Sequence, residues 1–123
     1  MTARGIAALM GFEAATLIVA STLHLAGAVN NGKPPFRPDR AGIAEAIIAV
    51  VLTAGAFALA RGRRRVAAGT VAFAIAGFIV GLSMTIRGGA TVDIAYHATV
   101  LPLLLITFAV LVRIRRQPWE RSR

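Results

Sequence analysis

Two histidines and a glutamate are the residues of this chain with the clearest capacity for chemistry. His24, Glu45 and His97 each stand in a different long apolar stretch of the sequence. Two imidazoles and a carboxylate form a ligand set that suits zinc or non-haem iron with open coordination positions. The same two histidines could instead be the axial ligands of a b-type haem inside a helix bundle. The sequence therefore predicts a divalent-metal or haem b site at these three residues.

A cofactor-free membrane enzyme is the second interpretation of the same region. A histidine and a carboxylate can act as a general acid and base, here His97 with Glu45. Asp93 stands four residues before His97, so either Asp93 or Glu45 could orient the imidazole, and Arg87 could stabilise an anion. This interpretation predicts an isomerase, cyclase or hydrolase that acts on a lipophilic substrate.

Four apolar stretches must position these residues, because together they take up most of the 123 residues. A helix needs about 20 mostly apolar residues to cross a bilayer. We expect membrane-spanning helices over residues 5–29, 41–60, 66–87 and 93–113. The connectors between the last three are so short that these helices must be antiparallel neighbours. The predicted fold is all-α, a four-transmembrane-helix antiparallel bundle that forms one membrane domain over residues 1–123.

The composition agrees with a membrane protein. Hydrophobic residues make up 57% of the chain, more than a core of this size can bury, so the surplus must face lipid. The chain has no cysteine, which excludes thiolate metal sites and thiol chemistry. The formal net charge of +9 comes from basic residues at the ends of apolar stretches, a placement typical of membrane topology. We expect the lipid bilayer as a partner, and no nucleic acid.

The basic residues also predict the orientation, because lysines and arginines are retained on the cytoplasmic side. Under the predicted topology one side holds Arg4, Arg61, Arg63, Arg64, Arg65, Arg113, Arg115, Arg116, Arg121 and Arg123. The other side holds Lys33, Arg37, Arg40 and Arg87. We therefore expect a multi-pass protein of the inner (plasma) membrane with both termini in the cytoplasm.

The expected topology places the titratable residues at one depth. At 1.5 Å per residue, His24 lies about 8 Å, Glu45 about 6 Å and His97 about 6 Å below the outer ends of their helices. The spacing of Asp93, His97, Val100 and Leu104 puts all four on one stripe of a helix. We expect a polar pocket that faces the outer leaflet and binds a metal, a haem or a small lipophilic ligand. Further ligand-binding side chains expected there are Met84, Thr85 and Tyr96.

Glu13 is the deepest charged residue, roughly in the middle of the membrane by residue count. It could couple transport to protons and contact a ligand, or it could be a neutral carboxylic acid bonded to Thr16 or to another helix. The segment Gly-Phe-Glu-Ala-Ala-Thr around it is similar to the glutamate segment of the small multidrug resistance transporters, over about one helix. The resemblance implies a small proton-coupled transporter that uses Glu13. The histidines and the strong charge bias depart from that family's pattern.

Rows of small residues predict close helix packing, which lipid-embedded helices need in place of a hydrophobic drive. Ala7, Gly11 and Ala15 form one row, and Gly77 and Gly81 form another. These rows could join helices within one chain, between copies in a homo-oligomer, or to a larger complex. The last case predicts an accessory subunit that needs no site of its own.

Overall fold

A computed structural model describes residues 1–29 and 32–114. These residues form four α-helices, α1 (Ala3–Leu25), α2 (Pro38–Ala60), α3 (Arg64–Gly88) and α4 (Thr91–Arg113). All four helices are long and apolar enough to cross a membrane. The predicted all-helical fold with four membrane-length helices is confirmed. The tail arginines at positions 115, 116, 121 and 123 lie outside the described residues.

Glycines end the first two helices. Gly27 and Gly62 have φ angles of 72° and 75°, which favour a residue without a side chain. The amides of Gly27 and Ala28 donate to the carbonyls of His24 and Leu23, the double hydrogen bond of a Schellman motif. The amides of Gly62 and Arg63 close α2 in the same way. The first helix therefore ends at Leu25, four residues before its predicted end, whereas α2 ends at residue 60 as predicted.

The later helices begin two or three residues before their predicted starts. Pro38 is the first residue of α2, a position that suits proline because that amide has no partner inside a helix. Arg64 and Arg65 form the first turn of α3, and Thr91 begins α4. A hydropathy pattern ignores such polar first turns, which explains the late predicted starts.

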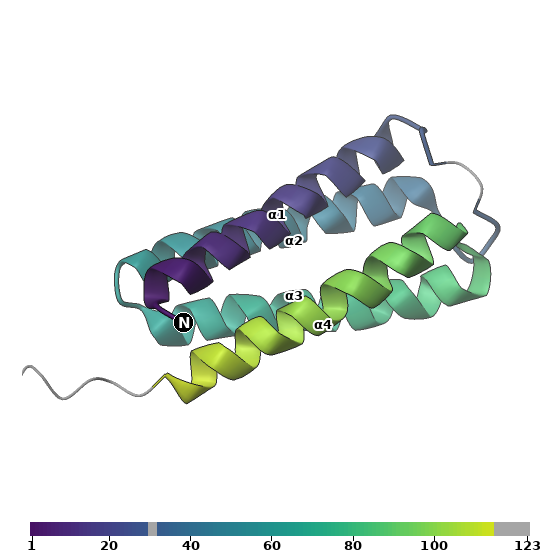
Figure 1. Cartoon of the computed structure of the whole chain (residues 1–123). Coiled ribbons are helices and arrows are strands. Elements are labelled where there is room, and N and C mark those ends of the chain that lie inside the picture. The colour runs from purple at the N-terminus through teal and green to yellow at the C-terminus, as the bar shows by residue number, and fades with distance from the viewer. Residues whose placement is uncertain (30–31, 115–123) are drawn as a thin grey trace, which may run out of the picture.

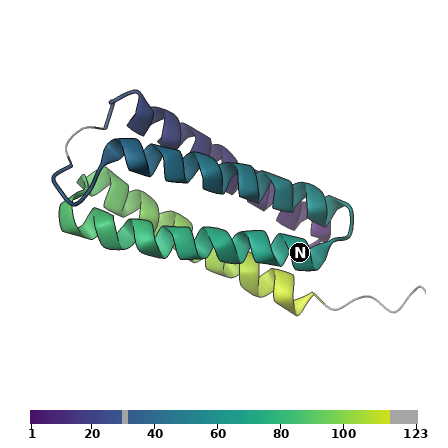
Figure 2. The same cartoon turned by 180° about the vertical axis from the view of Figure 1, so that it is seen from behind.

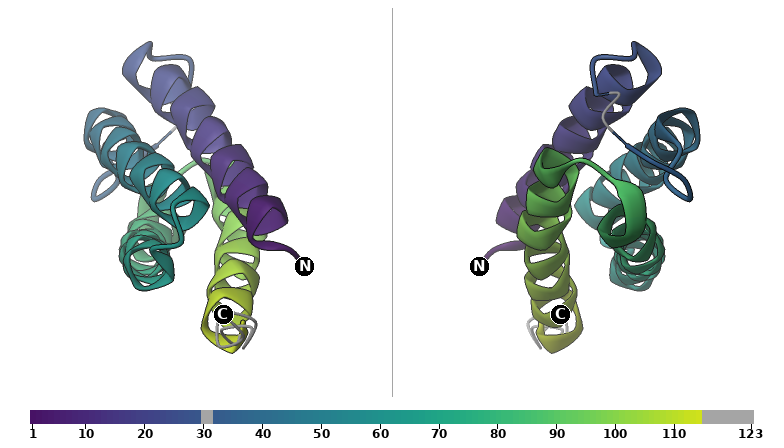
Figure 3. Two further views of the ribbon diagram at one scale, coloured as in Figure 1. Left: turned by 90° about the vertical axis from the view of Figure 1, so that its left-hand side faces the viewer. Right: turned by 90° about the vertical axis from the view of Figure 1, so that its right-hand side faces the viewer.

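The helices surround a common axis in the order of the sequence (Figures 1 and 2). Consecutive helices lie side by side, and the end view in Figure 3 shows α4 returning toward α1. The contact between α1 and α4 is the sparsest of the four. The connector after α1 and the turn between α3 and α4 lie at one end of the bundle, which we call the two-connector end (Figure 1). The N-terminus and the α2–α3 connector lie at the other.

The interior and the exterior of the bundle differ less in polarity than those of a soluble protein. Ile6, Met10, Leu17, Leu52 and Leu104 are fully buried in the core. The outer faces are also apolar, and large exposed side chains occur on every helix, among them Phe12, Val50, Phe57, Ile79 and Ile106. A bundle that is apolar on both sides is suited to lipid as its surroundings.

The two connectors at the two-connector end touch each other. The amide of Lys33 donates to the carbonyl of Gly88, with nitrogen and oxygen 2.6 Å apart. A Cβ atom at position 88 would overlap the carbonyl of Lys33. Glycine at position 88 therefore permits the close approach of the α1–α2 connector to the end of α3.

Candidate functional site

Buried polar residues gather in the half of the bundle toward the two-connector end. His24, Glu45, Thr85, Asp93 and His97 are each 7% exposed or less. Desolvating such groups is costly, and in membrane helices buried ionisable residues tend to mark function. Their arrangement therefore defines the candidate site.

His24 lies between two carboxyl groups. Its Nδ1 atom is 2.7 Å from Oε2 of Glu45 on α2, and its Nε2 atom is 3.1 Å from Oδ1 of Asp93 on α4. The second oxygens of these carboxyl groups, Oε1 of Glu45 and Oδ2 of Asp93, are buried with no hydrogen-bond partner among the described residues. The trio of Glu45, His24 and Asp93 thus connects three helices through one imidazole ring.

Phe36 covers this trio at the two-connector end. Its ring lies 5.9 Å from the His24 ring in an edge-on arrangement, and the side chain is buried although it belongs to a connector. Ser21 contributes a further polar link nearby, because its hydroxyl donates to the carbonyl of Gly42 over 2.7 Å. The trio is therefore enclosed by protein on the side where the connectors lie.

His97 is held by the backbone of its own helix. Its Nδ1 atom is 2.8 Å from the carbonyl oxygen of Asp93. A carbonyl only accepts, so Nδ1 carries the hydrogen, and Nε2 of the neutral ring presents a lone pair. A Cβ atom at Gly81 would lie 2.8 Å from Nε2, so the glycine permits the close approach of the imidazole ring to α3. Asp93 therefore contacts both histidines, one through its side chain and one through its backbone.

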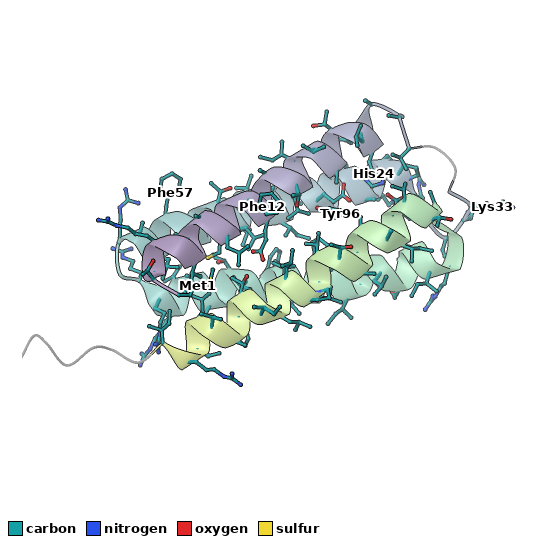
Figure 4. The ribbon with its side chains drawn as sticks, viewed as in Figure 1. Met1, Phe12, His24, Lys33, Phe57 and Tyr96 are labelled. Carbon is teal, nitrogen blue, oxygen red and sulfur yellow. The ribbon has the colours of Figure 1, made fainter. Side chains whose placement is uncertain are left out.

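Glu13 forms a second polar cluster deeper in the bundle. The Thr107 hydroxyl lies 2.8 Å from its Oε1 atom and 2.9 Å from the carbonyl oxygen of Leu103, and Oε2 has no partner among the described residues. The Thr16 hydroxyl donates to the backbone carbonyl of Glu13, and Tyr96 lies 3.1 Å from Thr16 through its own hydroxyl. Because the Thr16 hydrogen is already used, Tyr96 donates to Thr16. Figure 4 shows His24 and Tyr96 between the helices and Phe57 on the outside.

A cavity of about 490 Å³ opens between α2 and α3. Its walls are apolar, and Glu45, Thr85 and His97 are the buried polar residues among its lining. Phe73, Val80 and Met84 line it on α3 and are exposed on the outer face of that helix. Arg37 and Arg40 line it near the two-connector end and are also exposed. An apolar cleft with a few convergent polar groups is the usual form of a small-molecule site.

The structure brings some of the predicted site residues together and separates others. Glu45 and Asp93 meet at His24, whereas His97 turns toward the cavity and packs on Phe78, with the two rings 5.1 Å apart. Arg87, expected to stabilise an anion, is exposed, and no ion pair joins it to Asp93 in the described part of the chain. Tyr96 contacts Thr16 and does not line the cavity. Glu13 likewise lies outside the cavity lining.

The predicted metal ligands do not form a common cluster. Within residues 1–29 and 32–114, no group of three or more histidine, aspartate and glutamate side chains could hold a metal ion. Both nitrogens of His24 already face carboxyl oxygens, so an axial bond to haem would require one of these contacts to break. The arrangement of Glu45, His24 and Asp93 is that of a hydrogen-bonded trio.

Thr107 is the site residue that the sequence interpretation missed. Asp93, His97, Val100 and Leu104 are all buried, as the predicted stripe requires. Continuing that stripe by three residues reaches Thr107, so the helical spacing contained the signal. Phe36 gave no comparable signal, because a residue in a connector has no fixed face.

The small-residue rows have different surroundings. A Cβ atom at Gly77 would lie 2.6 Å from Cδ1 of Ile48, so this glycine packs against α2 within the chain. Gly81 packs against His97. Gly11 and Ala15 are exposed, and a Cβ atom at Gly11 would meet nothing within 4 Å. The predicted association between chains through either row stays a prediction.

Comparison of the chain with protein-family models, with curated protein sequences and with solved structures finds no match.

Proposed function

We propose that the cavity between α2 and α3 binds a small lipophilic molecule that enters from the surrounding lipid. One observation carries this proposal: a cavity with apolar walls reaches from the exposed face of α3 to the buried side chains of Glu45 and His97. Apolar walls bind the hydrocarbon part of a ligand, and a few polar groups orient its head. The cavity therefore fits an amphiphile with a small polar group.

We further propose that the bundle is a multi-pass protein of the plasma membrane, with antiparallel helices and both termini in the cytoplasm. Three side-chain pairs support the antiparallel arrangement of α1 and α4, namely Glu13 with Thr107, Thr16 with Tyr96 and His24 with Asp93. The partners follow in opposite order along the two helices. The excess of basic residues in the α2–α3 connector and the C-terminal segment supports the cytoplasmic termini.

Acid–base chemistry on the bound molecule is the catalytic form of this proposal. His97 has the geometry of a general base. In the neutral ring, Nδ1 donates its hydrogen bond to the backbone carbonyl of Asp93, and Nε2 carries the lone pair that can accept a proton. Glu45 lines the same cavity. These two residues are the acid–base pair that the cavity offers to an isomerisation, cyclisation or hydrolysis.

Photolabelling tests the binding site. The protein in phosphatidylcholine nanodiscs is exposed to a long-chain alcohol with a diazirine on its alkyl chain, and the labelled residues are identified by mass spectrometry. We expect labels to concentrate at Ile48, Phe73 and Met84, which line the cavity. Uniform labelling of the outer faces of all four helices would overturn the proposal.

Two glycine variants sharpen this test. In Gly77→Leu, the new side chain projects toward Ile48 and fills part of the cavity, so cavity labelling should fall several-fold. In Gly69→Leu, on the same helix, the new side chain meets open space, so labelling should stay unchanged. Equal labelling of both variants would contradict a site between α2 and α3.

A further inference from the structure

We propose that the ligand of the α2–α3 cavity is a lipophilic primary amine whose ammonium group is bound by Glu45, His97 and Thr85. This inference rests on the proposed function and names the chemical class of the ligand. Two observations support it: the hydrogen-bond acceptors of the cavity residues that have no donor in the structure, and the charge of the trio of Glu45, His24 and Asp93.

The three buried polar residues of the cavity lining all offer acceptors. In the neutral ring of His97, Nε2 presents a lone pair, because Nδ1 donates to the carbonyl of Asp93. The Thr85 hydroxyl donates to the carbonyl of Gly81 over 2.7 Å, which leaves its oxygen free to accept. Oε1 of Glu45 is buried and has no partner among the described residues. A complementary head group must therefore bring donors, and a primary ammonium group has three.

The charge of the trio also favours a cation. His24 can hydrogen-bond to both Glu45 and Asp93 only if the trio holds at least one proton more than two carboxylates and a neutral imidazole. With that one added proton, on the ring or on a carboxyl group, the three residues together carry a charge of −1. A net charge buried among apolar helices is costly unless a counter-charge accompanies it. An ammonium group bound beside Glu45 supplies that counter-charge.

The arginines of the cavity lining do not supply the counter-charge that the trio requires. Arg37 is exposed, and its guanidinium group pairs with Asp39 over 3.2 Å. Arg40 is exposed as well. Exposed ion pairs of this kind contribute little, whereas Glu45 is 5% exposed. The two arginines would favour an anionic amphiphile, so the test includes one.

Competition for the photolabelled cavity tests the amine. Wild-type protein in phosphatidylcholine nanodiscs is labelled with the diazirine alcohol at pH 7 in the presence of dodecylamine, dodecanol or dodecanoate. Labelling is measured relative to the exposed outer face of α1, which corrects for partition into the bilayer. We expect dodecylamine to halve cavity labelling at a concentration at least about tenfold lower than dodecanol, because charge-assisted hydrogen bonds are the strong ones. Dodecanoate should be the weakest competitor.

A quaternary ammonium separates hydrogen bonding from charge without any substitution. Dodecyltrimethylammonium has the charge of the amine but no N–H donor. We expect it to compete at least about tenfold more weakly than dodecylamine. Equal competition by the two cations would overturn the part of the proposal that assigns hydrogen bonds to Glu45, His97 and Thr85.

Two carboxyl variants test whether Glu45 is the residue that recognises the amine. Glu45→Gln should reduce the preference for dodecylamine over dodecanol to less than about threefold, while dodecanol still competes. Glu13→Gln is the matched control, because it changes another buried carboxyl group that does not line the cavity, and it should keep the wild-type preference. Equal competition by dodecylamine, dodecanol and dodecanoate, or strongest competition by dodecanoate, would overturn the assignment of an amine ligand but not the binding site. Absence of cavity labelling would overturn the proposed function itself.

Discussion

The carboxyl group of Glu13 and the hydroxyl group of Thr107 lie 2.8 Å apart, although 94 positions separate the two residues in the sequence. This hydrogen bond joins α1 to α4, the adjacent helix pair with the sparsest contact. The pairs of Thr16 with Tyr96 and His24 with Asp93 join the same helices. Polar side chains thus contribute much of the contact that closes the bundle, as expected where lipid gives no hydrophobic drive between helices.

Removing the Thr107 hydroxyl should destabilise this closure. In Thr107→Val the carboxyl group of Glu13 keeps no side-chain partner, and we expect the free energy of unfolding to fall by about 1 kcal/mol. Steric trapping in bicelles measures this change. Thr107→Ser keeps a hydroxyl at the same place and should retain most of the stability. If the valine and serine variants unfold alike, the hydrogen bond contributes nothing.

The trio around His24 should show strong coupling between its members. His24→Phe leaves two buried carboxyl groups without their partner, and we expect a loss of about 3 kcal/mol. Replacing all three residues, as His24→Phe with Glu45→Leu and Asp93→Leu, removes the buried charge and should recover much of that loss. The same unfolding assay compares the two. A triple variant less stable than the single one would show that no such charge penalty exists.

Two glycines with different surroundings should respond oppositely to alanine. A Cβ atom at Gly55 would overlap the Thr70 side chain and lie 2.9 Å from Cε of Met10, so Gly55→Ala should cost about 1–3 kcal/mol. A Cβ atom at Gly69 meets nothing within 4 Å, so Gly69→Ala should be neutral or stabilise the helix by up to about 1 kcal/mol. Steric trapping again gives the comparison, and equal effects would contradict the packing of α2 on α3.

The histidine protonation pattern can be read by nitrogen NMR. The chain has two histidines, so each variant that removes one leaves a single ring to observe. With His24 replaced by Gln, we expect the neutral form of the His97 ring to carry its hydrogen on Nδ1, because Nδ1 donates to the Asp93 carbonyl. A His97 ring protonated on Nε2 alone would remove the acceptor on which the amine proposal depends.

Cysteine accessibility tests the proposed orientation. The chain has no cysteine, so single substitutions can be labelled without background. A membrane-impermeant maleimide should label Lys33→Cys in intact cells and Arg63→Cys, in the α2–α3 connector, only after permeabilisation. The reverse pattern would place both termini outside and contradict the orientation predicted from the basic residues.

The helices could be predicted from the sequence because length and hydropathy alone set the requirement for crossing a bilayer. Their ends were less predictable. The end of α1 depends on Gly27, whose role appears only in the backbone conformation. The early start of α2 depends on Pro38, which hydropathy does not count as part of the helix.

The shared level of the candidate-site residues along the helices was predictable, but the pairing of their side chains was not. The rise per residue places His24, Glu45, Asp93 and His97 at one level, and three of them meet through the His24 ring. The rise does not say how each helix is rotated against its neighbours. That rotation directs His24 between two carboxyl groups and His97 toward the cavity, and so distinguishes a hydrogen-bonded trio from a shared metal site.

The close approach of Lys33 to Gly88 has a mechanical consequence for access to the cavity. The connector that continues from Lys33 supplies Pro35 and Phe36 to the cavity wall, while Gly88 is the last residue of the helix that forms the opposite wall. The hydrogen bond joins the segments that carry these two walls at the two-connector end of the bundle. A molecule that widens the cavity by separating these segments must therefore break this hydrogen bond. A molecule that enters between α2 and α3 can leave it intact.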